Sequence, residues 1–178
     1  MTMDFGFQRS DLRQVGWVVD DLDAAIKTWL ETTGAGPFYV MRHVAPESTR
    51  YRGKPASVDT SLAMAQFGGI QIELIEQHDD VPSAYRDSVP VGTSAVHHLG
   101  GFAQDFDAEV ERYVKLGIDI AYEGLFGDMR FAYIDTRSTI GCMTELMEPR
   151  PIILDLFAMV EEGSRNWDGS DPVRLVGD

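Results

Sequence analysis

The sequence predicts an α+β protein built from two βαβββ modules and a closing C-terminal helix. Two observations predict this class: an internal repeat, and strand-like and helix-like periodicity in the same order within each copy. The chain has 178 residues, of which 44% are apolar, so it is long enough to bury a core as one structural unit.

The repeat is visible when residues 14–24 are aligned with residues 98–108. A second match aligns residues 72–76 with residues 144–148. The first alignment pairs Gly16 with Gly100, Asp21 with Asp105, Asp23 with Asp107 and Ala24 with Ala108. Two matches in the same order indicate two copies of one module whose internal loops differ in length.

The first copy opens with an apolar segment at residues 12–19 that is typical of a buried strand. Asp21 follows as the expected N-cap, and apolar residues at helical spacing begin at Leu22. Gly34 marks the end of this helix. Turn signals such as Gly68-Gly69 separate the strands that follow. These strands are expected at residues 38–43, 56–67 and 70–76.

The second copy repeats this order. A strand at residues 96–103 leads to the expected N-cap Asp105, and an apolar stripe at helical spacing begins at Phe106. Gly117 stands where the helix should stop. The strands that follow are expected at residues 118–124, 130–135 and 142–147.

These elements divide the chain into four parts. Pro82, Pro90 and Gly92 are typical of a linker between the modules. The tail from Gly163 is polar and is expected to be loose. The predicted parts are the first module at 1–76, the linker at 77–95, the second module at 96–150, and the C-terminal helix and tail at 151–178.

Four polar residues interrupt strands that otherwise look buried: Gln14, Glu73, His98 and Glu145. Because side chains alternate along a strand, Gln14 and His98 point away from the flanking helices. Buried carboxylates are costly unless they are paired or bind a metal. Each residue alone is compatible with a structural or solvent-facing role, but repetition at equivalent positions favours a metal site. The set suits Zn²⁺, Co²⁺, Ni²⁺, Mn²⁺ or Fe²⁺ and does not choose between them.

Charge and composition exclude several classes of protein. Fifteen Lys and Arg against 29 Asp and Glu give a net charge of −14, which argues against nucleic-acid and membrane-surface partners. No apolar run approaches the ~20 residues that cross a bilayer. The single cysteine, Cys142, excludes a disulfide scaffold, and residues 1–5 show no secretory signal. A cytoplasmic location is expected.

At the four polar residues the chain resembles the vicinal oxygen chelate superfamily, which includes glyoxalase I, methylmalonyl-CoA epimerase, extradiol dioxygenases and bleomycin-resistance proteins. The resemblance covers roughly residues 12–148 and is carried by RQVGWVVDDLDAA, QIELIEQ, HHLGGFAQDFDAE and GCMTELME. It implies that the modules pair into one open, cupped mixed sheet with helices on the outside. It also implies a divalent metal held by Gln14, Glu73, His98 and Glu145.

The resemblance implies a metal-dependent isomerase, epimerase or lyase of glyoxalase-like type. Such an enzyme removes a proton next to a carbonyl and stabilises the enolate with its metal. Glu145 is the expected base, with Glu73 as the opposing acid or second base. The alternative, that both carboxylates are permanent ligands and the base comes from elsewhere, stays open. Epimerase-like members usually have histidine where Gln14 stands, whereas a Gln/Glu/His/Glu set resembles zinc-type glyoxalase I.

Two alternatives stay open. The first is a metal-dependent ring-cleaving dioxygenase, although that group uses two histidines and one glutamate. The second is a metal-free small-molecule-binding protein of the same fold. Because superfamily members often pair and an open cup exposes strand edges, a homodimer is a further expectation.

The substrate is expected to be a small molecule with an apolar or aromatic body. Phe38, Phe102 and Tyr133 are the aromatic residues expected to line its pocket, and Arg130 is the cation expected to meet a carboxylate or phosphate. His97 has the opposite strand parity to His98 and is expected to point toward the second helix as a packed or capping residue. His43 and His78 are expected at the surface rather than as ligands.

Overall fold

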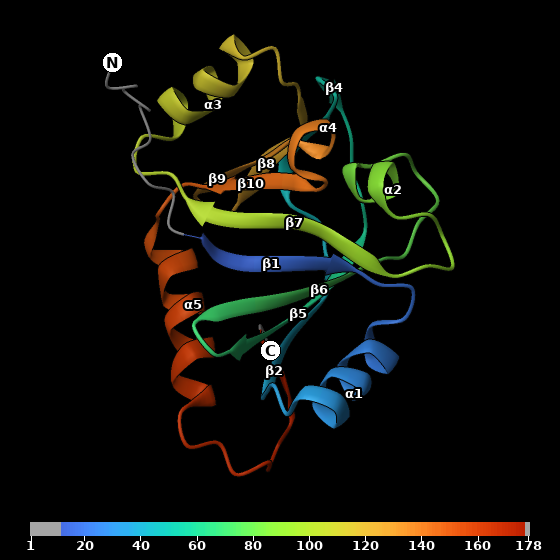
Figure 1. Ribbon diagram of the computed structural model, residues 1–178, viewed down its shortest axis with the longest axis vertical. Coiled ribbons are helices and arrows are strands. Elements are labelled where there is room, and N and C mark those ends of the chain that lie inside the picture. Colours follow the sequence, from blue (N-terminus) through green and yellow to red (C-terminus); the bar gives the residue numbers. More distant parts are fainter. Residues whose placement is uncertain (1–11, 177–178) are drawn as a thin grey trace.

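The structure is a computed structural model that describes residues 12–176 (Figure 1). Residues 1–11 of the first predicted module and residues 177–178 of the predicted tail lie outside this range. The segment at residues 1–5, on which the expectation of no secretory signal rests, is among them. No helix within 12–176 is long and apolar enough to cross a bilayer.

The first half of the chain contains the predicted strand, helix and strands, with one addition. Its helix starts at the N-cap Asp21, whose carboxylate accepts from the Ala24 N–H, and ends at Gly34 in the left-handed conformation. A short hairpin, β3–β4, was not predicted. The elements are β1 (Leu12–Val18), α1 (Leu22–Thr33), β2 (Phe38–Val44), β3 (Glu47–Tyr51), β4 (Lys54–Pro55), β5 (Thr60–Phe67) and β6 (Ile70–Gln77).

The second half repeats the βαβββ order. Asp105 caps its helix by accepting from the Ala108 N–H, as the repeat predicts. A single short turn of helix, α4, precedes the last strand. The elements are β7 (Ala95–Phe102), α3 (Phe106–Lys115), β8 (Ile120–Phe126), β9 (Met129–Ile134), α4 (Arg137–Ile140) and β10 (Met143–Met147).

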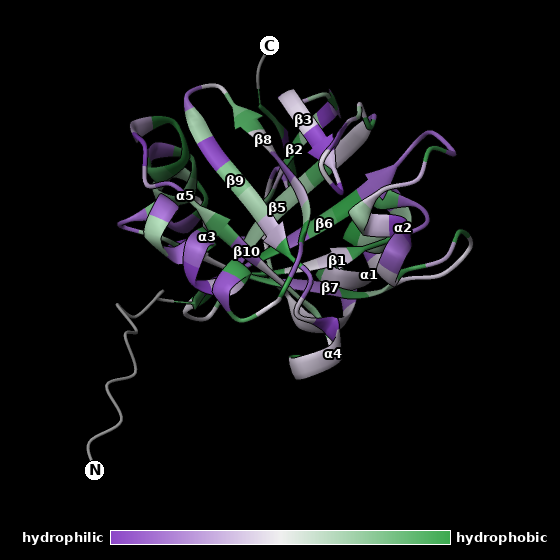
Figure 2. Cartoon of the chain, turned by 90° about the horizontal axis from the view of Figure 1, so that it is seen from above, coloured by the Kyte–Doolittle hydropathy of each residue, from purple (hydrophilic) through white to green (hydrophobic). Residues whose placement is uncertain are grey.

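Within the described residues all eleven strands form one mixed sheet in the order β11-β2-β5-β6-β1-β7-β10-β9-β8-β3-β4. The halves mirror each other about the antiparallel pair β1–β7, and β1 and β7 run parallel to β6 and β10 respectively. Seen from above, β8 and β9 lie on one side and β5 and β6 on the other, with β1 and β7 beneath them (Figure 2). The predicted α+β class and open, cupped sheet are confirmed.

The connecting segments hold two elements that were not predicted, and the expectation of a loose tail is wrong. The predicted linker contains a short helix, α2 (Ala84–Ser88), which starts at the N-cap Ser83. The tail expected to be loose contains β11 (Val173–Leu175), which pairs in parallel with β2. Both elements are short and are held by residues distant in sequence, so local periodicity does not show them.

Three apolar clusters fix the layers. On the outer face α1 packs on β2, β5 and β6, and α3 packs on β9 and β10. The inner face carries the largest cluster, which includes Tyr85 of α2. The predicted C-terminal helix is α5 (Pro151–Ser164), and it adds Ile153, Leu156 and Val160 to this inner cluster. The concave side of the sheet is therefore partly covered by α2 and α5.

Candidate metal centre

The four predicted donors lie on the four central strands: Gln14 on β1, Glu73 on β6, His98 on β7 and Glu145 on β10. Strand register brings them together around two glycines. Gly16 lies opposite both Glu73 and His98, and Gly100 lies opposite both Gln14 and Glu145. Each half of the repeat thus supplies two donors and one glycine.

The donors converge on the His98 ring. His98 Nε2 lies 3.4 Å from Glu73 Oε2, 3.3 Å from Glu145 Oε2 and 3.3 Å from Gln14 Oε1. His98 is fully buried and both carboxylates are less than 10% exposed. One ligand atom from each of Glu73, His98 and Glu145 lies within 4.8 Å of the others. The structure therefore brings all four predicted donors to one point.

A chain of hydrogen bonds orients the imidazole. His97 Nε2 lies 3.1 Å from the Ala84 carbonyl oxygen, so we assign the His97 proton to Nε2. Burial and the neighbouring His98 lower the pKa of His97 to about 3, which keeps its Nδ1 an acceptor. His98 Nδ1, 3.1 Å away, then donates to it. In the neutral His98 ring the Nε2 lone pair consequently faces the oxygens of the other donors.

The two buried carboxylates share His98 as their cationic partner among the described residues. Within the described residues neither Glu73 Oε2 nor Glu145 Oε2 receives a hydrogen bond. Burial raises the pKa of Glu73 to about 7, with His98 opposing and Glu145 adding to the shift. Burial disfavours the charged His98 ring, but Glu145 and Glu73 outweigh it and raise its pKa. The site therefore favours a positive charge at its centre.

The donor set fits a divalent metal ion. Gln14 Nε2 donates to Gln71 Oε1 at 2.6 Å, which turns the Gln14 carbonyl oxygen toward His98. One imidazole, two carboxylates and one amide oxygen are ligands that Zn²⁺ and its first-row neighbours accept. A second hydrogen-bond partner for each ligating side chain is typical of such sites, and Gln71 and His97 supply it here.

Gly16 and Gly100 are needed for this geometry. A Cβ atom at Gly16 would lie 2.0 Å from His98 Cε1, far closer than non-bonded atoms can approach. A Cβ at Gly100 would lie 3.1 Å from Glu145 Oε2 and 3.2 Å from Gln14 Oε1. The repeated glycines therefore make room for the donor side chains across neighbouring strands.

The donors lie at the floor of a cavity inside the cupped sheet. Its free interior volume is about 70 Å³, below the ~300–1,000 Å³ typical of drug-sized ligand sites. Gln14, Glu73 and Glu145 line it, and none of the described residues lining it is lysine or arginine. Its walls are mainly apolar and aromatic and include Met41, Leu62, Met64, Phe131, Tyr133 and Ile153.

Of the four residues expected to bind substrate, the structure brings only Tyr133 to this cavity. Its ring centroid lies 5.0 Å from that of His98. Phe38 is fully buried on the other face of the sheet, against α1, because its strand parity turns it outward. Phe102 packs against Phe157 of α5, with ring centroids 5.1 Å apart, and does not line the cavity.

Arg130 also lies outside the cavity. Its guanidinium donates to Asp107 and Glu148 and sits over the Phe106 ring. These contacts join α3 to the end of β10, so Arg130 has a structural role on the outer face. Sequence alone gave no signal for its acidic partners, which come from distant parts of the chain.

Sequence reasoning missed Tyr85 and His97. Tyr85 comes from α2, within the predicted linker, yet it lines the cavity next to Glu73 and Tyr133. His97 packs between Tyr85 and Tyr133 rather than toward α3. The doubled histidine was the one available signal for His97; Tyr85 had none, because no periodic pattern marks so short a helix.

Comparisons with known proteins agree with this architecture. Methylmalonyl-CoA epimerase from Mycobacterium tuberculosis is 22% identical, with a TM-score of 0.52 over 81% of this chain and 91% of that one. A methylmalonyl-CoA epimerase solved with methylmalonyl-CoA and NH₄⁺ is 19% identical, with a TM-score of 0.51 over 80% and 96%. A hypothetical protein from Bacillus halodurans is 14% identical, with a TM-score of 0.56 over 79% and 94%. At these identities the likeness shows the shared fold.

No curated protein matches the sequence. One family model does, over residues 13–133, which is more than half of the chain. This match includes β1, where Gln14 lies, and extends through most of the second module. The chain belongs to the Glyoxalase/Bleomycin resistance protein/Dioxygenase superfamily.

Proposed function

We propose that this chain is a metal-dependent enzyme that removes a proton next to a carbonyl group of a small, largely apolar substrate. The reaction class is that of an isomerase, epimerase or lyase. The observation that carries the proposal is the convergence of four buried donors at the floor of an apolar cavity. A buried arrangement of this kind is costly to maintain without a cation.

Gln14, Glu73, His98 and Glu145 would hold a divalent ion. When bound, the ion acts as a Lewis acid that stabilises negative charge developing on a substrate oxygen. Other residues position the ligands: Gln71 fixes the orientation of the Gln14 amide, and His97 fixes that of the His98 ring. The apolar walls of the cavity would exclude water from the site. Low polarity around the site strengthens each of these electrostatic interactions.

Glu145 is the proposed base. Its carboxylate lines the cavity and its Oε2 receives no hydrogen bond from the described residues. A carboxylate has two oxygens, so one can bind the ion while the other accepts a proton. Proton transfer requires hydrogen-bond reach to the substrate and a suitable pKa at working pH.

Glu73 is the proposed acid that returns the proton. Its Oε2 faces Glu145 Oε2 across His98 Nε2, so the two carboxylates would lie on opposite sides of a substrate bound between them. Return of the proton to the opposite face of the same carbon gives epimerisation. Return to the neighbouring carbon gives isomerisation.

The cavity favours a substrate whose body is apolar and whose vicinal oxygens reach the donor cluster. Its walls carry no described lysine or arginine, so they offer no cation to a carboxylate or phosphate. Methylmalonyl-CoA epimerases share the fold, and proton removal next to a carbonyl fits the same constellation. Ring cleavage fits less well, because the donors include one histidine rather than two.

Solvent exchange tests this proposal. The protein loaded with Co²⁺ is incubated in D₂O with a panel of small α-methyl thioesters and α-hydroxyketones, and deuterium incorporation is read by mass spectrometry. We expect Glu145→Gln to lose at least about 100-fold in exchange rate while keeping its circular dichroism spectrum, because a positioned base contributes about 10²–10⁴-fold.

The exposed Glu31→Gln is the matched control and should exchange like the wild type. Wild-type exchange rates in Glu145→Gln at full Co²⁺ occupancy would contradict the assignment of the base. Oxygen consumption with catechols, without deuterium exchange, would favour the ring-cleaving alternative. Absence of any bound divalent ion would favour a metal-free binding protein.

A further inference from the structure

We propose a second divalent-metal site outside the cavity, formed by His43, Asp59 and His78. These residues come from three neighbouring strands: His43 is in β2, Asp59 precedes β5 and His78 follows β6. The three positions meet because β5 runs antiparallel to both of its neighbours. The site is independent of the proposed function, since it shares no donor with the central cluster.

The three side chains already lie at ligand spacing. His43 Nδ1 is 2.9 Å from Asp59 Oδ2 and 3.1 Å from Oδ1, and the two imidazole centroids are 4.5 Å apart. One ligand atom from each residue lies within 4.8 Å of the other two. Small side-chain rotations would give the Zn–N distances of about 2.0–2.1 Å that imidazole ligands adopt.

The backbone turns His43 toward this cluster. The β2–β5 register slips between Met41 and Val44, and His43 within this irregularity has a φ of +50°, in the left-handed region. Bulges of this kind re-aim a side chain, and a non-glycine residue adopts such a φ only where its surroundings hold it. The His43 N–H donates to Ser61 Oγ, which anchors the turn.

His78 and Asp59 are also held in place. Ser61 Oγ is 2.7 Å from His78 Nε2, and Glu76 Oε1 is 3.4 Å from His78 Nδ1. The His78 N–H donates to the Asp59 carbonyl oxygen at 2.9 Å, and the Asp59 N–H donates to Asp79 Oδ2 at 2.9 Å. A bound ion would replace one contact of the His78 ring, while the other would set its orientation as in known metal sites.

The same region does not form the catalytic triad of a hydrolase. Ser61 contacts His78, and His78 contacts Glu76, as the nucleophile, base and orienting carboxylate of a hydrolase triad do. Ser61, however, is fully buried. A nucleophile must reach its substrate, and this hydroxyl cannot. The exposed members of the cluster are the metal-ligating ones, with the His43 side chain 67% and the Asp59 side chain 42% exposed.

Two imidazoles and one carboxylate suit Zn²⁺, Co²⁺ or Ni²⁺, and the solvent-facing side leaves room for water ligands. Val44 and Thr60, each next to a proposed ligand, line the cavity. The partners of His78, Ser61 and Glu76, form a cross-strand pair with the same parity as the pair Ala63 and Leu74, which packs against α1. The ion would therefore bind at the edge of the sheet on the face that carries α1, outside the cavity.

The chain contains four histidines, two at each cluster, so their NMR signals report on both sites. We would titrate Zn²⁺ into the full chain and follow the imidazole ¹H–¹⁵N correlations, with bound Zn²⁺ counted by equilibrium dialysis. The wild type should bind two equivalents. The His98→Ala variant should bind one, with shifts confined to His43 and His78.

The His43→Asn variant changes an exposed side chain and should keep the wild-type fold. It should bind one equivalent tightly and lose at least about 10-fold in affinity for the second, in line with removal of a ligating group. Unshifted His43 and His78 signals in His98→Ala at millimolar Zn²⁺ would overturn the proposal. That result would not bear on the central site or on the proposed function. If the wild type instead binds a single Zn²⁺ and only the His43 and His78 signals shift, the result would count against the central site.

Discussion

At the scale of single residues, two glycines and a second histidine decide what the central cluster can do. Gly16 and Gly100 each stand between two donors from neighbouring strands. A Cβ would overlap the His98 ring at Gly16 and would make tight contacts with Glu145 and Gln14 at Gly100. His97 sets which nitrogen of His98 carries the proton. None of these three residues is itself a proposed ligand, yet the site depends on each.

Replacing Gly16 by alanine should displace the His98 ring. The new methyl group would lie 2.0 Å from His98 Cε1, and overpacking of a filled site costs about 1–3 kcal/mol of unfolding free energy. Urea denaturation should show this loss, and Co²⁺ titration should show weakened binding. Gly69→Ala, where a Cβ meets open space, is the matched control and should leave both quantities unchanged. Equal stability and equal Co²⁺ affinity in the two variants would show that a Cβ at position 16 does not displace the His98 ring.

His97→Leu should lower the affinity for Co²⁺ by about 10–100-fold, the usual effect of removing a residue that orients a ligand. His97→Gln should retain most of the affinity, because the amide can donate to the Ala84 carbonyl and accept from His98 Nδ1. Imidazole ¹⁵N shifts should show a changed His98 tautomer in the leucine variant only. If His97 has only a structural role, the His98 tautomer should be unchanged in both the leucine and the glutamine variants.

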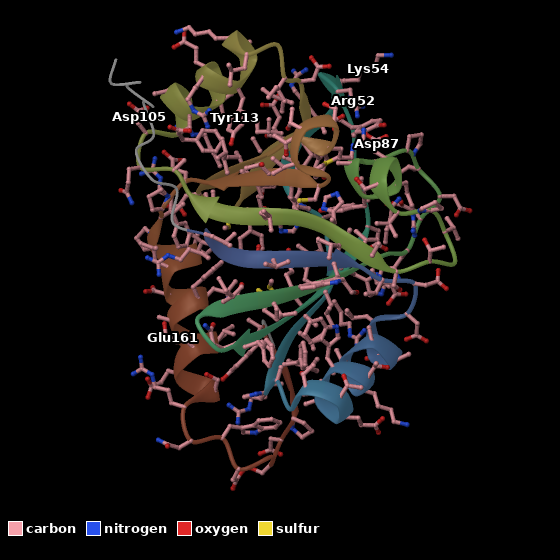
Figure 3. The ribbon with its side chains drawn as sticks, in the orientation of Figure 1. Arg52, Lys54, Asp87, Asp105, Tyr113 and Glu161 are labelled. Carbon is pink, nitrogen blue, oxygen red and sulfur yellow. The ribbon has the colours of Figure 1, made fainter. Side chains whose placement is uncertain are left out.

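At the scale of elements, an ion-pair network joins four short segments around α2. Arg52, in the β3–β4 turn, lies near Asp87 of α2 (Figure 3) and donates to it at 2.6 Å. It also donates to Asp135 at 2.7 Å. Arg137 of α4 donates to both oxygens of Asp135 and to the Asp87 carbonyl oxygen. This network fixes the hairpin and α2, which otherwise have few residues to hold them, beside the end of β9.

The network predicts acid sensitivity. Hydrogen bonds from Arg137 and then from Arg52 hold the pKa of Asp135 well below its usual range. A carboxyl whose pKa is depressed on folding stabilises the protein fully above its unfolded pKa of ~3.9, and that stability is lost as pH falls through the folded value. Asp135→Asn should therefore cost about 1–2 kcal/mol at pH 7.

Urea denaturation measured from pH 7 downward checks this. The wild type and Asp135→Asn should converge in unfolding free energy as the medium is acidified, because the wild type alone loses the carboxylate contribution. Asp128→Asn changes a residue in an exposed turn and is the control. Its unfolding free energy should change with pH in the same way as that of the wild type. If the unfolding free energies of the wild type and Asp135→Asn differ by the same amount at every pH, the Asp135 contribution is not electrostatic.

At the scale of the whole molecule, the central cluster joins the two halves of the repeat. Gln14 and Glu73 come from the first half and His98 and Glu145 from the second. The halves pair at the centre of the sheet through β1 and β7, and at its edge through β3 and β8. An ion bound by all four would therefore stabilise the pairing of the halves. The homodimer and the cytoplasmic location stay predictions.

Binding of a divalent ion should raise the unfolding temperature. An ion that binds only the folded chain adds about 2.7 kcal/mol of stability at 100 times its Kd. Differential scanning calorimetry with Zn²⁺ and with EDTA should show one cooperative transition that moves to higher temperature with the metal. Much of this shift should be absent in His98→Ala. Separate melting of the two halves in the presence of metal would contradict a shared site.

The sequence alone was enough to predict the order of strands and helices in each half and to place Gln14, Glu73, His98 and Glu145 on buried strands. The Asp21 and Asp105 caps, the helical stripes and the strand parity of Gln14 and His98 are local features, and the repeat doubled each signal. The hairpin β3–β4, the helix α2 and the strand β11 were missed or mistaken. Each is short and is stabilised by partners far away in the chain, such as Asp87 and Asp135 for the β3–β4 turn.

What the sequence by itself determined is therefore the period and parity of its elements: which residues repeat, which face each occupies, and that four polar groups share buried positions. Only the tertiary structure decided which distant side chains meet. Phe38 packs in the outer core, and Arg130 forms a surface ion pair. Tyr85 and His97 pack on the inner face. The His43–Asp59–His78 cluster forms at the ends of three neighbouring strands. Periodicity is a property of neighbours along the chain, whereas contacts across a sheet depend on strand order and register, which no single segment encodes.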